Sequence, residues 1–464
     1  MRVGGRIAVV GGGVSGLAAA HRLRRLVPDA EITVIDGAAR LGGALRTVEL
    51  AGVALDVGAE AFLVRRPEAT ALVTELGLGA DLIHPTSAAP TVRAGGRTVG
   101  LPTRTVLGLP ASADAVAGLL SPAGRARVAA EAAMPLAWEP GTDVAVGALV
   151  RSRAGDELVD RLVDPLLGGV YAGRADALGL RATVPQVAAA LDRGAGSLLA
   201  AAAAVLPPKG ASRTPVFGTL RGGLGRLVEA LTGAATTVRC GSPVRALVRR
   251  EQGWRLELGS GEALDVDAVV LAVPAPALRR LLADPVPSAA AALARVEVAS
   301  SVVVGLALPC SAALPASSGV LIASGEPQAA KAFTFSSRKW EHLRAPGVLL
   351  VRGSLGRHGE VAAVQRDDVE LVAAVRADLA ALTGVDAEPV ATVVSRWGGG
   401  LPQYAPGHLD VVAAVEAAVD GQPGLAVAGA ILHGVGIPAC IATADAAAAR
   451  IAAHLAAVGG MMNA

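Results

Sequence analysis

The sequence predicts an α/β fold built from three parts, and three observations support this prediction. A strand, a glycine-rich turn and a helix open the chain at residues 6–26, and the same order of elements returns at residues 425–457. Between these ends, residues 104–206 have the helical spacing of alanine, leucine and arginine, whereas residues 236–258 alternate like antiparallel strands. We therefore expect a discontinuous dinucleotide-binding domain that is interrupted by an α+β insertion and by a helical insertion.

The first unit has the spacing of a Rossmann-like dinucleotide site. An apolar strand precedes Gly11, Gly13 and Gly16, a helix follows them, and a second strand ends in Asp36. Gly11 allows the sharp exit from the strand, Gly13 lets the backbone approach a pyrophosphate, and Gly16 lets the helix lie close to the strand. The helix directs its free N–H groups toward the phosphates. Asp36, twenty residues after Gly16, is placed to bind a ribose hydroxyl.

The middle and the end of the chain supply the remaining elements. Residues 53–59 predict a strand that closes the first unit, and the apolar residues 268–274 predict a buried central strand of a parallel sheet. The clearest helix of the later part covers residues 367–382. Residues 425–430 and 434–438 then repeat the strand and the glycine turn, before an alanine-rich helix that ends near residue 457.

These elements predict the domain boundaries, and a chain of 464 residues is long enough for two to three domains. We expect a dinucleotide-binding domain at residues 1–65, 215–280 and 405–464, a substrate-binding domain at residues 66–103 and 281–404, and a helical domain at residues 104–214.

The composition narrows the class of protein. A net charge of +2, without any run of lysine or arginine, argues against nucleic-acid binding. The seven histidines are scattered and no H-x-x-x-H or C-x-x-C pair occurs, so we predict no metal site. Cys240, Cys310 and Cys440 are odd in number and far apart, which predicts buried free thiols in a reducing cytoplasm.

The mean hydropathy of +0.51 raises the question of membrane spans. The uncharged stretches 299–325 and 421–444 are broken by proline, glycine and serine, so neither predicts a spanning helix. The N-terminus enters the first strand at once and leaves no room for a signal peptide. We expect a cytoplasmic protein, and the sequence leaves peripheral membrane contact open.

Five motifs stand in order along nearly the whole chain: Val10–Leu17, Arg40–Thr47, Gly169–Gly173, Leu401–His408 and Gly434–Ile441. Together they resemble bacterial FAD-dependent protoporphyrinogen and coproporphyrinogen oxidases, which belong to the monoamine-oxidase-like flavoproteins. The resemblance implies an FAD domain, a substrate domain and a helical domain that is often described as membrane-facing. It also implies noncovalent FAD, because no cysteine tether stands near residues 397–400.

Carried over to this chain, the resemblance implies a set of FAD-binding residues. Arg40 would bind the diphosphate through charge-assisted hydrogen bonds. The start of a helix near residue 437 would stabilise negative charge on the flavin pyrimidine. The expected cofactor-binding residues are Gly11, Gly13, Val14, Ser15, Gly16, Asp36, Arg40, Gly42, Gly43, Val244, Gly429, Val435, Gly436 and Ile437.

The resemblance also implies a substrate pocket, since a porphyrinogen is an apolar disc with carboxylate arms that needs apolar walls and a cationic rim. The expected wall residues are Gly169, Val170, Tyr171, Phe333, Phe335 and Tyr404, and each of them is equally compatible with an ordinary core. Arg66 is the first candidate for the rim, followed by Arg65 and Arg338, and a solvated surface arginine is the alternative for each.

One difference from the family bears on the substrate. Eukaryotic-type protoporphyrinogen oxidases carry an arginine upstream of a Gly-Gly turn, and Pro90 stands at the matching position before Gly95-Gly96. This difference favours coproporphyrinogen III, whose four propionates can bind several rim cations, with protoporphyrinogen IX as the alternative. The expected reaction passes hydride from the methylene bridges to FAD in three steps, with molecular oxygen reduced to hydrogen peroxide. No residue of the sequence stands out as a catalytic acid or base.

Two other classes stay open. An amine oxidase of the same superfamily would bring an aromatic pair and often a cysteine tether to the flavin. A non-catalytic escort of the GDI type would use the fold without flavin, and the intact glycine and Asp36 site argues against it. Contact with the next enzyme of the haem pathway is also left open.

Overall fold

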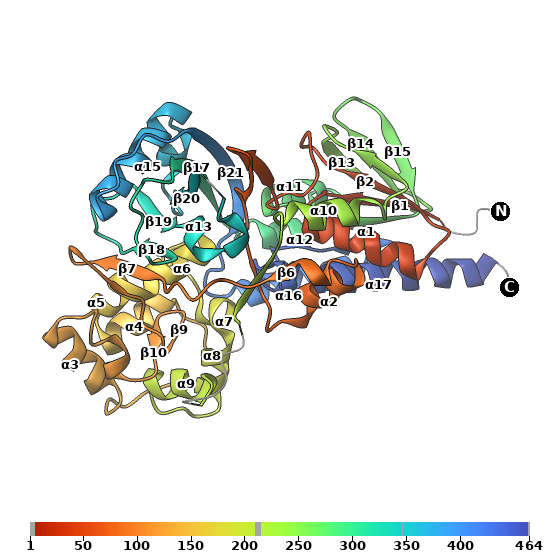
Figure 1. Ribbon diagram of the computed structural model, residues 1–464. Coiled ribbons are helices and arrows are strands. Elements are labelled where there is room, and N and C mark those ends of the chain that lie inside the picture. Colours follow the sequence, from red (N-terminus) through yellow and green to blue (C-terminus); the bar gives the residue numbers. More distant parts are fainter. Residues whose placement is uncertain (1–4, 209–214, 346, 463–464) are drawn as a thin grey trace.

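The computed structural model describes residues 5–208, 215–345 and 347–462, so the predicted domain ends at residues 1, 214 and 464 lie outside the described residues. Figure 1 shows two lobes side by side, with the helical part below the left lobe. The fold is α/β, as the sequence predicted.

A five-stranded parallel sheet forms the centre of the right lobe (Figure 1). The prediction of a buried central strand at residues 268–274 is confirmed, because β16 lies between β1 and β22 and is buried throughout. The prediction for residues 236–239 was wrong, since β12 pairs in parallel with β2 instead of joining an antiparallel sheet. A strand of three residues carries too little pattern to reveal its partner. In spatial order the strands are β12 (Thr237–Arg239), β2 (Glu31–Ile35), β1 (Arg6–Val10), β16 (Ala268–Leu271) and β22 (Leu425–Val427).

Helices cover both faces of this sheet. One face carries α1 (Val14–Leu26), α2 (Pro67–Glu75), α10 (Gly225–Thr232) and α17 (Ile437–Met462). The other carries α11 (Ala275–Leu282), α12 (Pro287–Leu293), α16 (His408–Asp420) and a small antiparallel sheet of β13 (Val244–Arg249), β14 (Trp254–Leu258) and β15 (Ala263–Val266). Both α2 and α12 were assigned to the substrate-binding domain from the sequence, yet both pack beside the dinucleotide sheet. The predicted domain boundaries remain a proposal, and these two helices argue for moving them.

A seven-stranded sheet forms the left lobe. The predicted helix at residues 367–382 is confirmed as α15 (Asp368–Thr383), which Asp367 caps by accepting a hydrogen bond from Glu370 N, and α15 covers one face of the sheet. In spatial order the strands are β21 (Ala391–Pro402), β17 (Val298–Pro309), β20 (Val348–Leu355), β19 (Ala330–Thr334), β18 (Gly319–Ile322), β7 (Thr91–Ala94) and β8 (Arg97–Gly100). The short helices α13 (Ser336–Lys339) and α14 (Val361–Gln365) flank them.

Residues 122–205 form the predicted helical part, which shares one core with β7. Its helices are α3 (Pro122–Glu131), α4 (Val146–Ala154), α5 (Asp156–Leu158), α6 (Asp164–Tyr171), α7 (Leu180–Thr183), α8 (Pro185–Asp192) and α9 (Leu198–Val205). Two-stranded and three-stranded pairings of short strands complete the fold: β3 (Thr47–Leu50) with β4 (Val53–Asp56), β9 (Thr105–Val106) with β10 (Leu109–Pro110), and β5 (Phe62–Leu63) with β11 (Phe217–Leu220) and β6 (Leu82–Ile83).

A partly buried charge cluster joins the loop after β4 to the seven-stranded sheet. The Glu60 carboxylate binds Arg352 at 2.7 Å and also pairs with Lys339, and the Arg352 guanidinium donates to the Gly58 carbonyl at 2.7 Å. Burial alone would raise the pKa of Glu60, but the charges of Lys339 and Arg352 outweigh it and lower the pKa to about 2. Glu60 therefore stays ionised and fixes the loop after β4 to β20.

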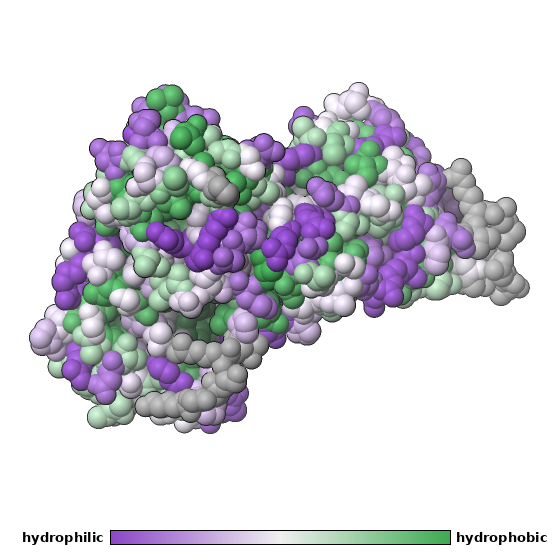
Figure 2. Space-filling view, viewed as in Figure 1, coloured by the Kyte–Doolittle hydropathy of each residue, from purple (hydrophilic) through white to green (hydrophobic). Residues whose placement is uncertain are grey.

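By length and composition one helix among the described residues, Ile437–Gly459 within α17, is apolar enough to cross a membrane. Its first turns are buried against α1 in the core of the right lobe, through small side chains such as Ala444 and Ala448. The space-filling view shows hydrophilic residues spread over the visible face of both lobes (Figure 2). Of the three cysteines predicted to be buried, Cys440 is buried, Cys240 is partly buried and Cys310 is exposed, and all three are free.

Candidate functional site

The three glycines of the first turn have different surroundings. A Cβ on Gly16 would lie 1.8 Å from the Gly11 carbonyl oxygen, and Gly11 itself has a φ of +106° and would bring a Cβ within 2.3 Å of the Ala272 oxygen. At Gly13, by contrast, the nearest atom would be 3.9 Å away. Gly11 and Gly16 are thus required by the packing of β1, α1 and β16. Gly13 leaves space beside the first amides of α1, which have no acceptor within the helix.

Asp36 ends β2 next to this turn, and backbone amides hold its carboxylate. Oδ2 accepts a hydrogen bond from Gly12 N at 2.6 Å, and Oδ1 accepts one from Ala38 N at 2.7 Å. Each oxygen of a carboxylate can accept more than one hydrogen bond. Asp36 therefore keeps acceptor capacity toward the cavity that it lines.

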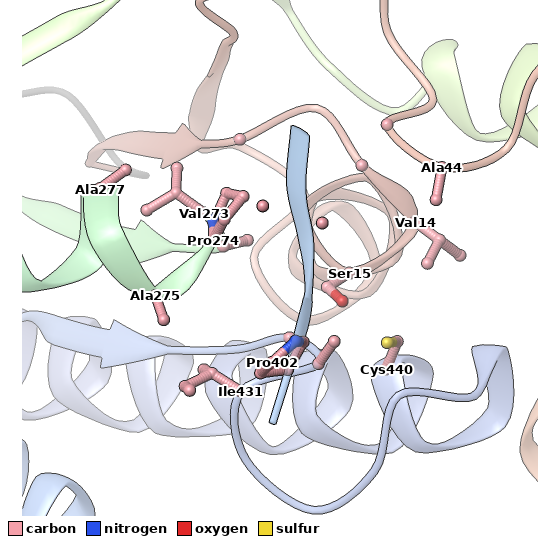
Figure 3. Close-up of a pocket in the computed structure, with 18 of the residues that line it drawn as sticks. Val14, Ser15, Ala44, Val273, Pro274, Ala275, Ala277, Pro402, Ile431 and Cys440 are labelled. Atoms are coloured by element: carbon pink, nitrogen blue, oxygen red, sulfur yellow. The ribbon is translucent and has the colours of Figure 1, made fainter. Parts of the chain in front are cut away.

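A cavity of about 450 Å³ opens at the carboxyl edge of the parallel sheet. Figure 3 shows side chains from α1, from the turn after β16, from the end of β21 and from the start of α17 around one space. Its walls are mostly apolar or glycine. The predicted cofactor residues that line it are Gly11, Gly13, Val14, Ser15, Asp36, Gly43, Val244, Gly429, Val435 and Ile437.

Four predicted cofactor residues do not line this cavity: Gly16, Arg40, Gly42 and Gly436. The Arg40 guanidinium donates to the carbonyls of its own loop, at 3.0 Å to both Leu41 and Gly43, and so holds the loop in place. Gly42 donates to the Gly12 carbonyl at 2.7 Å and joins this loop to the glycine turn. Arg40 and Gly42 thus shape the cavity from behind its wall.

The segment before α17 closes the far side of the cavity. The Tyr404 hydroxyl donates to the Ala430 carbonyl at 2.5 Å, and the Gly429 amide donates to the Thr443 hydroxyl at 3.0 Å. Burial raises the pKa of Cys440 to about 11, so its thiol is protonated at neutral pH. Cys440 therefore contributes a neutral surface to the wall.

The predicted substrate residues are not brought together as expected. Phe333 and Phe335 are buried between the seven-stranded sheet and α15, so assigning them to a pocket wall was wrong. Tyr404 is also buried, with its ring 5.5 Å from the ring of Tyr171 and stacked on His408 at 3.9 Å. Side chains along a strand alternate between the two faces of the sheet, and the sequence alone does not show which face packs against the core.

Other predicted substrate residues lie at the surface. Gly169 and Val170 of α6 are exposed. Arg66 pairs with Glu68 at 2.8 Å, Arg65 is exposed, and Arg338 donates to the Leu314 carbonyl at 3.1 Å. None of the predicted substrate residues lines the 450 Å³ cavity.

The structure adds lining residues that sequence reasoning missed. Cys440 and Leu401 lie inside two of the five recognised motifs, so these motifs could have pointed to both residues. No motif points to Arg280, because it follows an ordinary strand and proline turn. The added residues include Ala44, Pro243, Val273, Pro274, Ala275, Arg280, Gly399, Gly400, Leu401, Pro402, Ile431 and Cys440.

The comparison with known families decides which ligand this cavity takes. Residues 14–452 match the family described as flavin containing amine oxidoreductase. The chain belongs to this family. It is therefore a flavoprotein oxidoreductase with FAD as its cofactor, and the open space at Gly13 beside the N-terminus of α1 fits a pyrophosphate.

Individual relatives match the chain from end to end. It is 48% identical to the coproporphyrinogen III oxidase of Mycobacterium leprae, over 97% of this chain and 98% of that one. It is 27% identical to the chloroplastic protoporphyrinogen oxidase 1 of Arabidopsis thaliana, over 93% of this chain and 85% of that one. A crystal structure from Exiguobacterium sp. 255-15, described as a candidate protoporphyrinogen oxidase, superimposes with a TM-score of 0.85 at 31% identity over 97% of this chain and 98% of that one.

Proposed function

We propose that this protein oxidises coproporphyrinogen III to coproporphyrin III with FAD and molecular oxygen. The observation that carries the proposal is the 48% identity to a coproporphyrinogen III oxidase over nearly the full length of both chains. The similarity to the plant protoporphyrinogen oxidase is lower, at 27%. We therefore place coproporphyrinogen III before protoporphyrinogen IX as the substrate.

The face of the seven-stranded sheet that points away from α15 is our candidate for the substrate wall. Leu321, Ala332 and Ser354 stand directly opposite one another on β18, β19 and β20, and all three are half-buried. Phe333, the next residue along β19, is buried. A Cβ on Gly169 of α6 would lie 3.7 Å from Leu321. Gly169 and Val170 therefore lie over this face and are exposed. This is the placement expected of residues that line a pocket for an apolar, disc-shaped substrate.

Arg352 connects this face with the cofactor cavity. It stands opposite Thr334 on the same face, and its guanidinium holds Glu60 and the Gly58 carbonyl, on either side of Ala59 in the cavity wall. We propose that Arg352 orients one substrate carboxylate at this junction, where that carboxylate would compete with Glu60 for the guanidinium. Arg66 stays our candidate for a second one, although binding there would compete with Glu68.

The residues of this chain position the reactants instead of exchanging protons. FAD, when bound, would accept hydride from the methylene bridges and reduce molecular oxygen to hydrogen peroxide. Three such steps remove six hydrogens from the macrocycle, and the gain of aromaticity supplies the driving force. The apolar cavity wall excludes water from the flavin, and the pyrrole protons leave to solvent. We further propose a cytoplasmic location. Two contacts are to be tested: peripheral contact with a membrane, and contact with the enzyme that next uses the porphyrin.

The decisive experiment compares the two porphyrinogens. Purified, FAD-loaded protein is given each substrate under air, and porphyrin fluorescence and hydrogen peroxide are followed together. We expect coproporphyrinogen III to react faster, with three peroxides for each porphyrin. If neither porphyrinogen is oxidised, the proposal is wrong.

A variant pair tests the substrate wall. Gly169→Leu would fill the space in front of Leu321 and should raise KM for the porphyrinogen without changing flavin content. Gly118→Leu is the matched control, because Gly118 is exposed and a Cβ there would meet open space. Equal KM values for the two variants would remove Gly169 from the substrate wall.

A further inference from the structure

Among the described residues, two charged side chains line the cofactor cavity: Asp36 and Arg280. Arg280 lies in the last turn of α11, the helix that starts after β16. Because α11 packs against β13, the Arg280 guanidinium reaches the Val244 carbonyl, to which Nη2 donates at 3.3 Å. One cation is thus held at the rim of a cavity that must accept an anionic dinucleotide.

Most of the hydrogen-bonding capacity of Arg280 is unused. A guanidinium has five N–H donors, and the bond to Val244 is its one protein contact of this kind in the described part of the chain. The neighbouring lining residues Pro243, Ala277 and Leu281 are apolar and offer no side-chain acceptor. Arg280 is exposed and lies beside an apolar surface, so the N–H groups that do not bind Val244 are available to a ligand in the cavity.

The corner that Arg280 occupies is the adenosine end of the cavity. Asp36 marks the ribose at the end of β2, and a Cβ on the next residue, Gly37, would lie 3.3 Å from Pro243. Val244 and Arg280 continue this corner. Figure 3 shows Ala277 of the same helix on one side of the space, and Ala44 and Val14 on the other.

We propose that Arg280 binds the adenine ring of FAD and makes this site select the dinucleotide over FMN. A purine offers ring nitrogens that accept hydrogen bonds and a π face on which a planar guanidinium stacks. Pro243 and Leu281 supply the apolar contact that a flat base needs. This inference rests on the FAD site described above and adds a residue and a selectivity to it.

A purely structural role for Arg280 is the alternative, because basic residues in the last turn stabilise a helix through its dipole. Arg279 stands next to Arg280 in the same helix turn, has the same charge and is exposed like Arg280, but it does not line the cavity. Arg279→Ala is therefore the matched control for Arg280→Ala. Arg280→Lys keeps the charge and loses the planar fork.

The test measures nucleotide binding to the full-length protein with its flavin removed. FAD, FMN and ADP are titrated separately, and circular dichroism confirms that each variant is folded. For Arg280→Ala we expect FAD and ADP to bind about tenfold more weakly and FMN to bind as in the native protein. Arg280→Lys should fall between the two, and Arg279→Ala should match the native protein.

Two outcomes would overturn the inference: unchanged affinity of Arg280→Ala for FAD and ADP, or an equal loss for FMN. The second would assign Arg280 to the phosphates or to the fold. Failure of the proposed function is separate, because it would appear as native protein that binds FAD and oxidises no porphyrinogen.

Discussion

Alanine at Gly13 and alanine at Gly16 should have opposite effects, although the two residues stand three positions apart. At Gly16 the new Cβ would lie 1.8 Å from a backbone oxygen, so α1 must move away from β1. Overpacking of this kind costs about 1–3 kcal/mol of unfolding free energy or more. At Gly13 the φ of −73° suits any residue and the space is open. There we expect stability within about 1 kcal/mol of the native protein.

Flavin binding should follow the opposite order. A side chain on Gly13 points to where the backbone must approach the pyrophosphate, so Gly13→Ala should weaken FAD binding while the fold is kept. Gly13→Glu adds a like charge. At about 4 Å and an effective dielectric constant of about 20, such a repulsion costs about 4 kcal/mol, or roughly a thousandfold in affinity.

Two measurements separate the effect on stability from the effect on flavin binding. Thermal melts of the flavin-free variants measure stability, and the flavin fluorescence that appears when the holoenzymes are diluted measures loss of FAD. The reasoning is refuted if Gly13→Glu keeps a full complement of FAD. It is also refuted if the two alanine variants melt at the same temperature.

Three further predictions concern single side chains. Tyr404→Phe keeps the ring stack and loses the hydrogen bond to Ala430, which costs roughly 1 kcal/mol. FAD should therefore bind about five- to tenfold more weakly in a fluorescence titration. Burial and the nearby charge of Arg357 lower the pKa of Lys331 to about 8, so the folded protein binds this proton less readily than the unfolded chain. Stability should therefore rise between pH 8 and 10.5, and Lys331→Met should abolish this rise in urea titrations. Burial raises the pKa of Asp56 to about 6 from 3.8, so stability should fall by up to about 3 kcal/mol as the pH rises through that window, and Asp56→Asn melts should lack this slope.

The glycine turn shows what local sequence can predict. β1, α1, Asp36 and the start of α17 were all identified because each depends on neighbouring residues: an apolar run, a turn that needs glycine, and a helix that follows. The same holds for β16, whose uninterrupted apolar residues require cover on both faces.

Positions that depend on long-range packing were not predictable. Phe333 lies on the α15 side of β19, and a bulge between Ala330 and Ala332 shifts the register just before it. No periodicity in five residues reveals this. Arg280 reaches the cavity because α11 packs on β13, and α2 joins the dinucleotide core because it packs against α17. Each of these contacts joins segments that are distant in the chain, so the sequence pattern around them looks ordinary.

The lining of the cavity, from Val10 near the start of the chain to Cys440 in α17, has a consequence for biosynthesis. Domains fold as they leave the ribosome, starting from the N-terminal side. The glycine turn emerges early, but the Gly429–Ile437 wall is made only after almost everything else has been translated. The cavity wall is therefore complete only after the first turn of α17 has been synthesised, and a chain that stops before residue 429 should leave the ribosome without a closed flavin site.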